Sequence, residues 1–182
     1  LKVRLEHLGL WLKDHPVDAI ALQELKTPDE QFPADAVRAL GLHAAHYGQK
    51  TYNGVAILAR KPPADVTTGI PDHDDPQRRV IAATVGGIRL VNVYVPNGQE
   101  VGSDKYAYKL DWLAALRSTV ADEAAEPTPF AVLGDFNVAP TDADVWDRAA
   151  FDGQTHVTDR ERAALAALRD VGLTDVFPRP LK

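Results

Sequence analysis

The stretch Phe130-Ala131-Val132-Leu133-Gly134-Asp135-Phe136-Asn137 decides the fold class. Its short apolar run is typical of a strand covered on both faces, and the run ends in a carboxylate and an amide. Strand alternation sends Asp135 and Asn137 to the same face. A second apolar run, Ala19–Leu22, ends in the same way at Gln23 and Glu24. If the two predicted strands lie side by side, these polar groups converge at one sheet edge.

Further helices and strands are predicted around these two runs. Gly86-Gly87 is a strong hairpin signal, so the strands on either side of it are expected to pair antiparallel. Thr158-Asp159-Arg160-Glu161 has the spacing of a capping box and is expected to open the last helix, which closes at Gly172. Further helices are predicted from Leu5 to Leu12, from Ala34 to Leu40 and from Ser103 to about Ala124, and further strands at 43–47, 54–59, 80–85 and 88–95. The pattern predicts one layered α/β domain over residues 1–182.

Composition limits the function classes. The chain has 182 residues, and 20 Lys+Arg against 26 Asp+Glu give a formal charge of 20 − 26 = −6. This acidity argues against coating nucleic acid by bulk charge, but it does not exclude an enzyme that acts on phosphate esters. With no cysteine, any metal must be held by carboxylate, amide or imidazole groups, which favours a hard cation such as Mg²⁺. No apolar run is long enough to span a membrane and no leader is evident, so we expect a cytoplasmic protein.

The two strand-end clusters suggest a metal site. A glutamate opposite an aspartate and an asparagine can hold a divalent cation beside a phosphate ester. Each residue also has an ordinary explanation. Glu24 alone is a surface residue after a strand, and Asp135 with Asn137 is a common turn composition.

Other candidate residues lie near strand and helix ends. Tyr94 shares a strand face with Asn92, where its phenol either stands over a site or is half-buried against the sheet. Arg78 and Arg79 either grip a phosphate or are a solvated pair. Lys105 and Lys109 are four residues apart on a predicted helix, where they either line a groove for a polyanion or are simply exposed.

Taken together, these motifs resemble the exonuclease III family of DNA-repair nucleases, in the family's order. The residues that carry the resemblance are 22–26, 53–58, 77–81, 92–98, 105–109, 133–142 and 172–177. The resemblance implies the four-layered α/β sandwich of DNase I-like proteins, with two packed mixed sheets flanked by helices. It also implies Mg²⁺- or Mn²⁺-dependent hydrolysis of DNA phosphodiesters, as an abasic-site endonuclease and three-prime exonuclease or phosphatase.

The resemblance also implies roles for individual residues. Glu24 would bind the metal, with Asp135 and Asn137 beside it. Tyr94 would contact the phosphate or the attacking water, Asp135 would orient or deprotonate the nucleophile or protonate the leaving group, and Asn137 would donate to the charge that develops on the phosphate. DNA or phosphate contacts would come from Gln23, Arg78, Asn97 and Lys105.

The chain departs from the family pattern at both ends. The family's first strand would precede Leu1, and its last strands, with a second Asp and an Asp-His pair, would follow Lys182. If the molecule truly ended at these positions, we would expect it to be inactive and poorly stable, because the second sheet would lack strands; we expect instead a longer protein of which this sequence is a part. We expect a monomer that acts on double-stranded DNA with abasic sites or blocked three-prime ends, without membrane partners. Two alternatives stay open: a phosphatase of the same superfamily acting on inositol phosphates or lipid head groups, and a non-catalytic binding module.

Overall fold

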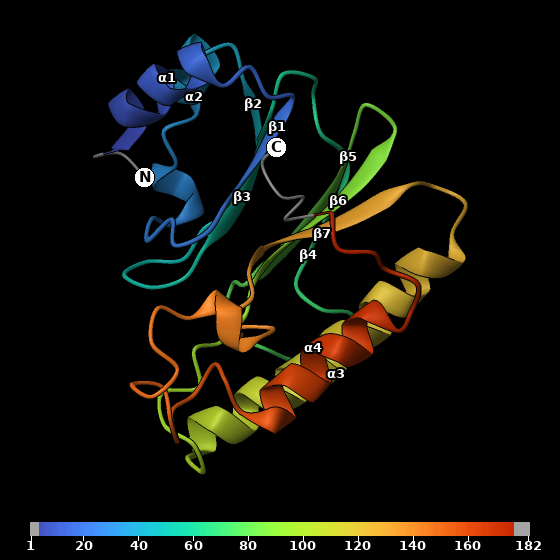
Figure 1. The fold of residues 1–182 in the computed structure, drawn as a ribbon. Coiled ribbons are helices and arrows are strands. Elements are labelled where there is room, and N and C mark those ends of the chain that lie inside the picture. Colours follow the sequence, from blue (N-terminus) through green and yellow to red (C-terminus); the bar gives the residue numbers. More distant parts are fainter. Residues whose placement is uncertain (1–3, 177–182) are drawn as a thin grey trace. The chain divides into compact units, whose positions relative to one another are not determined.

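The computed structural model of the chain describes residues 4–176 (Figure 1). Its helices are α1 (Leu5–Asp14), α2 (Ala34–Ala39), α3 (Asp104–Ala125) and α4 (Asp159–Arg169), with short 3-10 turns η2 (Asp29–Gln31) and η3 (Asp142–Asp144). Its strands are β1 (Ala19–Leu22), β2 (His43–Tyr47), β3 (Val55–Ala59), β4 (Ala64–Thr68), β5 (Val80–Val85), β6 (Ile88–Tyr94) and β7 (Phe130–Asp135). These elements form two compact units. Of the described residues, the first unit contains 4–94 together with Thr128–Asp135, and the second contains Val95–Pro127 together with 136–176.

Two sheets build the first unit. One has the strand order β1-β3-β2, with both pairs antiparallel. The other has the order β4-β5-β6-β7, in which only the β6-β7 pair is parallel. Gly86 and Gly87 both have positive φ angles of 60° and 87°, which explains why the hairpin between β5 and β6 needs glycine. The predicted antiparallel pair is therefore present.

The central strand β3 connects the two cores of the first unit. Every residue of Val55–Ala59 is buried, because both faces of the strand are covered. One face packs against the second sheet, in a cluster of Val55, Ile57, Ala59, Ile81, Ala83 and Val85 with Ala45. The other face, through Ala56 and Leu58, packs against Val37 of α2 and the leucines of α1. Strand alternation thus holds a sheet between another sheet and a pair of helices.

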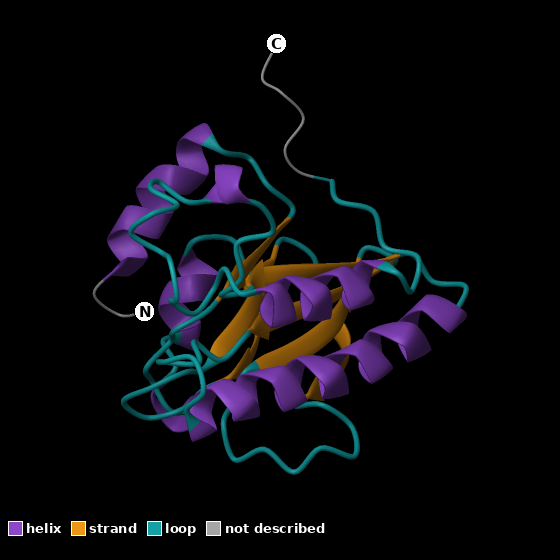
Figure 2. Cartoon of the chain, turned by 60° about the horizontal axis from the view of Figure 1, so that its bottom comes forward, coloured by secondary structure: helices purple, strands orange, loops and turns teal. Residues whose placement is uncertain are grey.

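In the second unit, α3 and α4 lie side by side (Figure 1 and Figure 2). Ser103 caps α3 by accepting a hydrogen bond from the backbone N–H of Tyr106. Thr158 caps α4, and Glu161 completes the capping box as the spacing predicts. Trp112, Leu113 and Leu116 of α3 are fully buried, so this helix contributes a continuous apolar face to the core.

Most elements lie where the sequence predicts them, with three differences. Strand β4 was not predicted, because its residues Ala64–Thr68 are all exposed at a sheet edge and carry no apolar pattern. Strand β7 ends at Asp135, and Asn137 has a left-handed backbone with φ +47°. The alternation that was expected to align these two side chains therefore does not extend to Asn137. Finally, β1 and β7, both predicted to be covered on both faces, are edge strands of their sheets in the described residues, and neither is fully buried.

Within residues 4–176, no helix is long and apolar enough to cross a bilayer. Phe177, the last residue of the motifs quoted above, lies outside the described residues. That residues 1–182 form one domain stays a prediction.

Candidate active site

Three strand ends of the first unit carry the candidate catalytic groups. Glu24 follows β1, Tyr94 is the last residue of β6, and Asp135 is the last residue of β7. In the parallel pairing of β6 with β7, Tyr94 is the register partner of Asp135. The phenol of Tyr94 donates a hydrogen bond of 2.7 Å to Oε1 of Glu24. The structure thus brings Glu24 and Tyr94 into direct contact and places Asp135 on the neighbouring strand.

The arrangement of the strands that carry Glu24 and Asp135 differs from the predicted one. Strands β1 and β7 belong to different sheets, so they do not lie side by side in one sheet. The two sheets instead pack face to face, and β1 contacts β7 across the interface. The sheet stacking thus brings the end of β1 beside β7, with Tyr94 bonded to Glu24 and paired in register with Asp135. Sequence patterning alone does not distinguish stacked strands from paired ones.

The hydrogen bond between Tyr94 and Glu24 sets the protonation of both groups. Burial, and then the bond to Glu24, raise the pKa of Tyr94 to about 12, although the Arg79 guanidinium 4.7 Å from its ring centre acts in the opposite direction. Hydrogen bonds from Lys26 and then Tyr94 lower the pKa of Glu24 below its ordinary value. At neutral pH the site therefore holds a neutral phenol donor and an ionised carboxylate.

The backbone around Glu24 has an uncommon conformation. Glu24 and Lys26 both have left-handed φ angles, of 54° and 51°. The backbone N–H groups of Leu25 and Lys26 donate to the carbonyls of Gly54 and Asn53, which holds the loop in place. Left-handed conformations of non-glycine residues persist where surrounding contacts enforce them, and they cluster at functional sites. Here the conformation directs the Glu24 side chain toward Tyr94.

Asn92 forms hydrogen bonds to the end of β1, the strand that precedes Glu24. Its side chain is fully buried, and its amide nitrogen donates to the carbonyls of Leu22 and Ala56 at 2.9 Å each. Its amide oxygen accepts from Nε2 of Gln23 at 2.7 Å. Asn92 thus joins β6 to β1 and β3 across the two sheets, and it shares the inner face with Tyr94 as alternation predicts. Gln23, expected to contact DNA, makes this internal bond in the structure, and its DNA contact stays a prediction.

The two arginines before β5 are held by protein groups. Arg78 pairs with Asp29 and also donates to the Gly48 carbonyl, with its guanidinium over the Tyr47 ring. Arg79 donates to the carbonyl of Tyr94 at 3.0 Å. Of the two, Arg79 contacts a candidate catalytic residue and Arg78 does not. A phosphate contact by Arg78 stays a prediction.

The donor chemistry of this site fits a hard divalent cation. The Glu24 side chain is 48% exposed and ionised, and Asp135 is an exposed carboxylate beside Tyr94. Carboxylate oxygens are the protein ligands that Mg²⁺ prefers, and Mg²⁺ keeps several waters or phosphate oxygens in addition. Residues 4–176 contain no group of three or more histidine, aspartate or glutamate side chains arranged to hold a metal.

The remaining candidate groups lie in the second unit. Asn137 follows β7 in the chain, and its side-chain nitrogen donates to the Val95 carbonyl at 2.8 Å. Asn97 lies in the loop before α3, with its side-chain nitrogen 3.0 Å from Nε2 of His156. Sequence reasoning missed His156 because Asn97 is 59 residues away and no local pattern marks the histidine. Its backbone φ of 80° is again left-handed.

The expected groove of Lys105 and Lys109 is corrected by the structure. Lys105 is exposed on α3, but the side chain of Lys109 is completely buried and forms an ion pair of 2.5 Å with Glu161 of α4. One lysine faces solvent and the other lies in the core, so they do not line one surface. The spacing of four residues puts two side chains on one helix face, but it does not say whether that face is exposed.

Comparison with known proteins identifies the family. Residues 1–180 match the Endonuclease/Exonuclease/phosphatase family. The chain belongs to this family. Exodeoxyribonuclease III of Haemophilus influenzae is 32% identical over 192 residues, which cover 97% of this chain and 71% of that protein.

Solved structures of family members are also similar. The 3′-5′ exonuclease NExo of Neisseria meningitidis is 48% identical with a TM-score of 0.93, and the match covers 96% of this chain and 69% of NExo. A further structure, of NExo described as a 3′ phosphatase and bound to a product DNA hairpin, has a TM-score of 0.92 over 95% of this chain and 68% of NExo. An AP endonuclease of Archaeoglobus fulgidus is 32% identical with a TM-score of 0.92, over 96% of this chain and 68% of that one.

These similarities confirm several expectations. The resemblance to the exonuclease III family holds, and so does the α/β fold with two packed sheets of the DNase I-like type. Family membership also confirms a hydrolase of the DNA-repair nuclease type.

Proposed function

We propose that this chain hydrolyses phosphate esters at the three-prime ends of double-stranded DNA, with Mg²⁺ as its metal and Mn²⁺ as a substitute. One observation carries the proposal: Tyr94, at a strand end of the first unit, is hydrogen-bonded to Glu24 and is the register partner of Asp135 on the adjacent strand. The Neisseria proteins that support the three-prime assignment are 48% identical, against 32% for the AP endonuclease. Incision at abasic sites is the second expected activity.

Each residue has a proposed part in the reaction. Glu24 holds the metal, and its ionised state suits that task. Tyr94 keeps its proton at neutral pH and donates to a phosphate oxygen. Asp135 orients the attacking water or removes its proton. Asn137 donates an amide N–H to the charge that develops on the phosphate.

Bound Mg²⁺ would neutralise charge on the phosphate oxygens as the ester bond breaks. The protein groups contribute by being fixed before the substrate binds. Donors that need no reorganisation stabilise developing charge better than mobile ones, and removing one such donor costs about 10²–10³ in rate. The bonds from Tyr94 to Glu24 and from Asn137 to Val95 supply that fixation.

The proposal is tested with the full-length protein on labelled DNA duplexes. One duplex carries a recessed three-prime phosphate, a second an unmodified recessed end, and a third an internal abasic-site analogue. We expect release of the three-prime phosphate in Mg²⁺ and none with a chelator. Glu24→Gln should lower the rate by at least about 10²-fold, whereas the matched variant Glu30→Gln, at an exposed glutamate of η2, should retain it.

Other outcomes would change the proposal. Incision at the abasic analogue without three-prime phosphate release would replace the substrate but keep the site. Hydrolysis of inositol polyphosphates without action on DNA would overturn the nuclease assignment. A Glu24→Gln protein with the wild-type rate would overturn the assignment of Glu24 to the metal. Monomeric state and cytoplasmic location stay predictions.

A further inference from the structure

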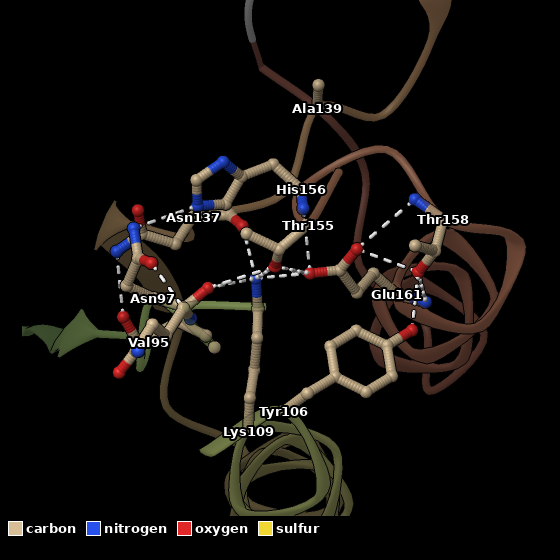
Figure 3. Close-up of polar contacts among 12 residues, drawn as sticks. Val95, Asn97, Tyr106, Lys109, Asn137, Ala139, Thr155, His156, Thr158 and Glu161 are labelled. Carbon is tan, nitrogen blue, oxygen red and sulfur yellow. Dashed lines mark hydrogen bonds and ion pairs between the residues drawn. The ribbon is translucent and has the colours of Figure 1, made fainter. Parts of the chain in front are cut away.

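A buried ion pair lies at the centre of the second unit (Figure 3). The Nζ of Lys109 is 2.5 Å from Oε1 of Glu161, and both side chains are completely inaccessible to solvent. Lys109 comes from α3 and Glu161 from the first turn of α4, 52 residues later. The pair therefore joins the two helices of this unit at their N-terminal ends.

The ammonium of Lys109 also binds two loop carbonyls. It donates to the backbone oxygen of Asn137 at 2.6 Å and to that of Asn97 at 3.1 Å, and it lies 3.5 Å from Oγ1 of Thr155. An ammonium has three N–H donors. Glu161 Oε1 and the two carbonyl oxygens lie closer to the ammonium than Thr155 Oγ1 does. Lys109 thus fixes the peptide group of Asn137, which the proposed function assigns to the DNA phosphate, and that of Asn97, for which the sequence predicts a DNA contact.

The loop that contains Asn97 is shaped to admit this lysine. Gly98 has φ +91°, and a β-carbon at this position would lie 3.0 Å from Cδ of Lys109 and 3.0 Å from Oγ1 of Thr155. A larger residue would push the loop away from the ammonium. The loop can therefore approach Lys109 this closely because position 98 is a glycine.

Glu161 holds residues 155–158, which lie around the Lys109 ammonium together with the segments that contain Asn97 and Asn137. Its Oε1 accepts from the Thr155 hydroxyl at 2.7 Å and the His156 N–H at 2.8 Å. Its Oε2 accepts from the hydroxyl and the N–H of Thr158. The carboxylate thus organises residues 155–158 while it neutralises Lys109. Nε2 of His156 in turn lies 3.0 Å from the side-chain nitrogen of Asn97. The loop held by Glu161 and the loop held by Lys109 are therefore in contact.

Stability alone does not account for this arrangement. A buried ion pair loses much of its attraction to the cost of removing two charges from water, and apolar side chains of similar size often stabilise a core as well. Apolar side chains cannot, however, hold two carbonyl oxygens at a fixed point. The distinctive property of Lys109 is that it orients peptide groups.

We propose that Lys109 is a positioning residue, which holds the Asn97 and Asn137 peptides so that their side-chain amides are directed at the DNA phosphate. Asn137 is constrained twice: Lys109 binds its carbonyl and Val95 accepts from its amide. Asn97 is also constrained, because Lys109 binds its carbonyl and its Oδ1 accepts from the Gln99 N–H. The inference rests on the proposed function of Asn137 and on the predicted DNA contact of Asn97.

Lys109→Met in the full-length protein tests the proposal. Methionine fills a similar volume and donates no hydrogen bond. We expect kcat for three-prime phosphate release in Mg²⁺ to fall by about 10- to 100-fold, because misplacing a group by about 1 Å has effects of this size. KM should change less than kcat. The matched control is Leu116→Ala, which removes fully buried volume from the same helix and should lower Tm without lowering kcat.

A double-mutant cycle with Asn137→Ala separates positioning from general stability. If Lys109 acts through Asn137, Lys109→Met should reduce kcat much less in the Asn137→Ala background than in the wild type. Additive losses, or a kcat that tracks Tm across Lys109→Met and Leu116→Ala, would overturn the positioning role. If Lys109→Met yields no folded protein, Lys109→Gln, whose shorter amide cannot span both carbonyls, is judged by the same criteria.

Failure of the proposed function is distinguishable from failure of this inference. If Asn137→Ala retains the wild-type kcat, the catalytic assignment of Asn137 is wrong and the positioning role falls with it. If Asn137→Ala lowers kcat and Lys109→Met does not, only the positioning role is overturned.

Discussion

Tyr94 donates its O–H to Glu24, and this one bond decides the state of both groups. Because burial and the neighbouring carboxylate raise its pKa to about 12, the phenol stays protonated at neutral pH. A tyrosine in this state is a hydrogen-bond donor and not a nucleophile or base. Since the folded-state pKa lies above the ordinary value of 10.0, the associated stability is present below pH 10 and is lost as the pH rises toward 12.

Tyr94→Phe tests this role directly. The variant keeps the ring under Arg79 but removes the donor, so we expect the rate of three-prime phosphate release to fall by about 10²-fold. The free energy of unfolding should change by no more than about 1.5 kcal/mol, the usual net value of one hydrogen bond. Tyr52→Phe is the control, because Tyr52 is 68% exposed. Single-turnover kinetics and urea denaturation measure the two quantities, and an unchanged rate would remove Tyr94 from the site.

At the level of elements, the junction of β6 and β7 depends on Gly134. A β-carbon there would lie 2.0 Å from the carbonyl oxygen of Val93 on the adjacent strand, and φ is +137°. Only glycine allows β7 to stay paired up to Asp135, the register partner of Tyr94.

We therefore expect Gly134→Ala to damage both stability and activity. The strand end must move away from β6, which should cost about 2–4 kcal/mol of unfolding free energy and displace Asp135. Thermal denaturation and the single-turnover rate measure the two effects. Wild-type stability together with a wild-type rate would contradict the close approach of the two strands.

Glu161 both caps the N-terminus of α4 and carries a buried negative charge. Burial acts to raise the pKa of Glu161, but hydrogen bonds from Lys109, Thr155, His156 and Thr158 outweigh it and lower the pKa from 4.5 to about 2. A carboxyl group with a lowered pKa stabilises the folded state above its ordinary pKa, and this contribution is lost as the pH falls from about 4.5 to about 2.

Glu161→Gln should accordingly make the free energy of unfolding less dependent on pH between about 4.5 and about 2. At neutral pH we expect a loss of roughly 3 kcal/mol, and the difference from the wild type should shrink as the pH falls toward 2. Urea denaturation over a series of pH values measures the difference. Glu126→Gln, at an exposed glutamate after α3, should leave the curve unchanged. A constant difference at all pH values would show that Glu161 acts only as a neutral cap.

Local patterns predicted the elements better than the contacts between them. The capping box at Thr158 was predicted because its signal lies within four residues, but the partner of Glu161 is 52 residues away on α3. Lys109 was interpreted as a surface residue for the same reason. Strand β4 was missed because an exposed edge strand needs no apolar pattern. The contact of Glu24 with Tyr94 depends on sheet stacking, which strand periodicity does not encode.

On the scale of the whole molecule, charge limits how DNA can be bound. The formal charge of −6 repels a polyanion at long range. Arg78, Arg79 and Lys109 bind protein groups in this structure. Affinity should therefore come from a small number of ionic contacts and from the metal-assisted site, so the dependence on salt should be shallow.

Lys105 is the exposed lysine for which a phosphate contact is expected, and salt dependence tests it. Each lysine that neutralises a phosphate contributes about 0.9 to the slope of log K against log salt concentration. Lys105→Ala should weaken DNA binding and reduce the magnitude of this slope by about 1. Lys61→Ala removes the same charge from an exposed loop after β3 and should change neither. Fluorescence anisotropy with a short duplex over a salt series measures both variants. Equal slopes for the wild type and Lys105→Ala would mean that Lys105 contributes only to the net charge.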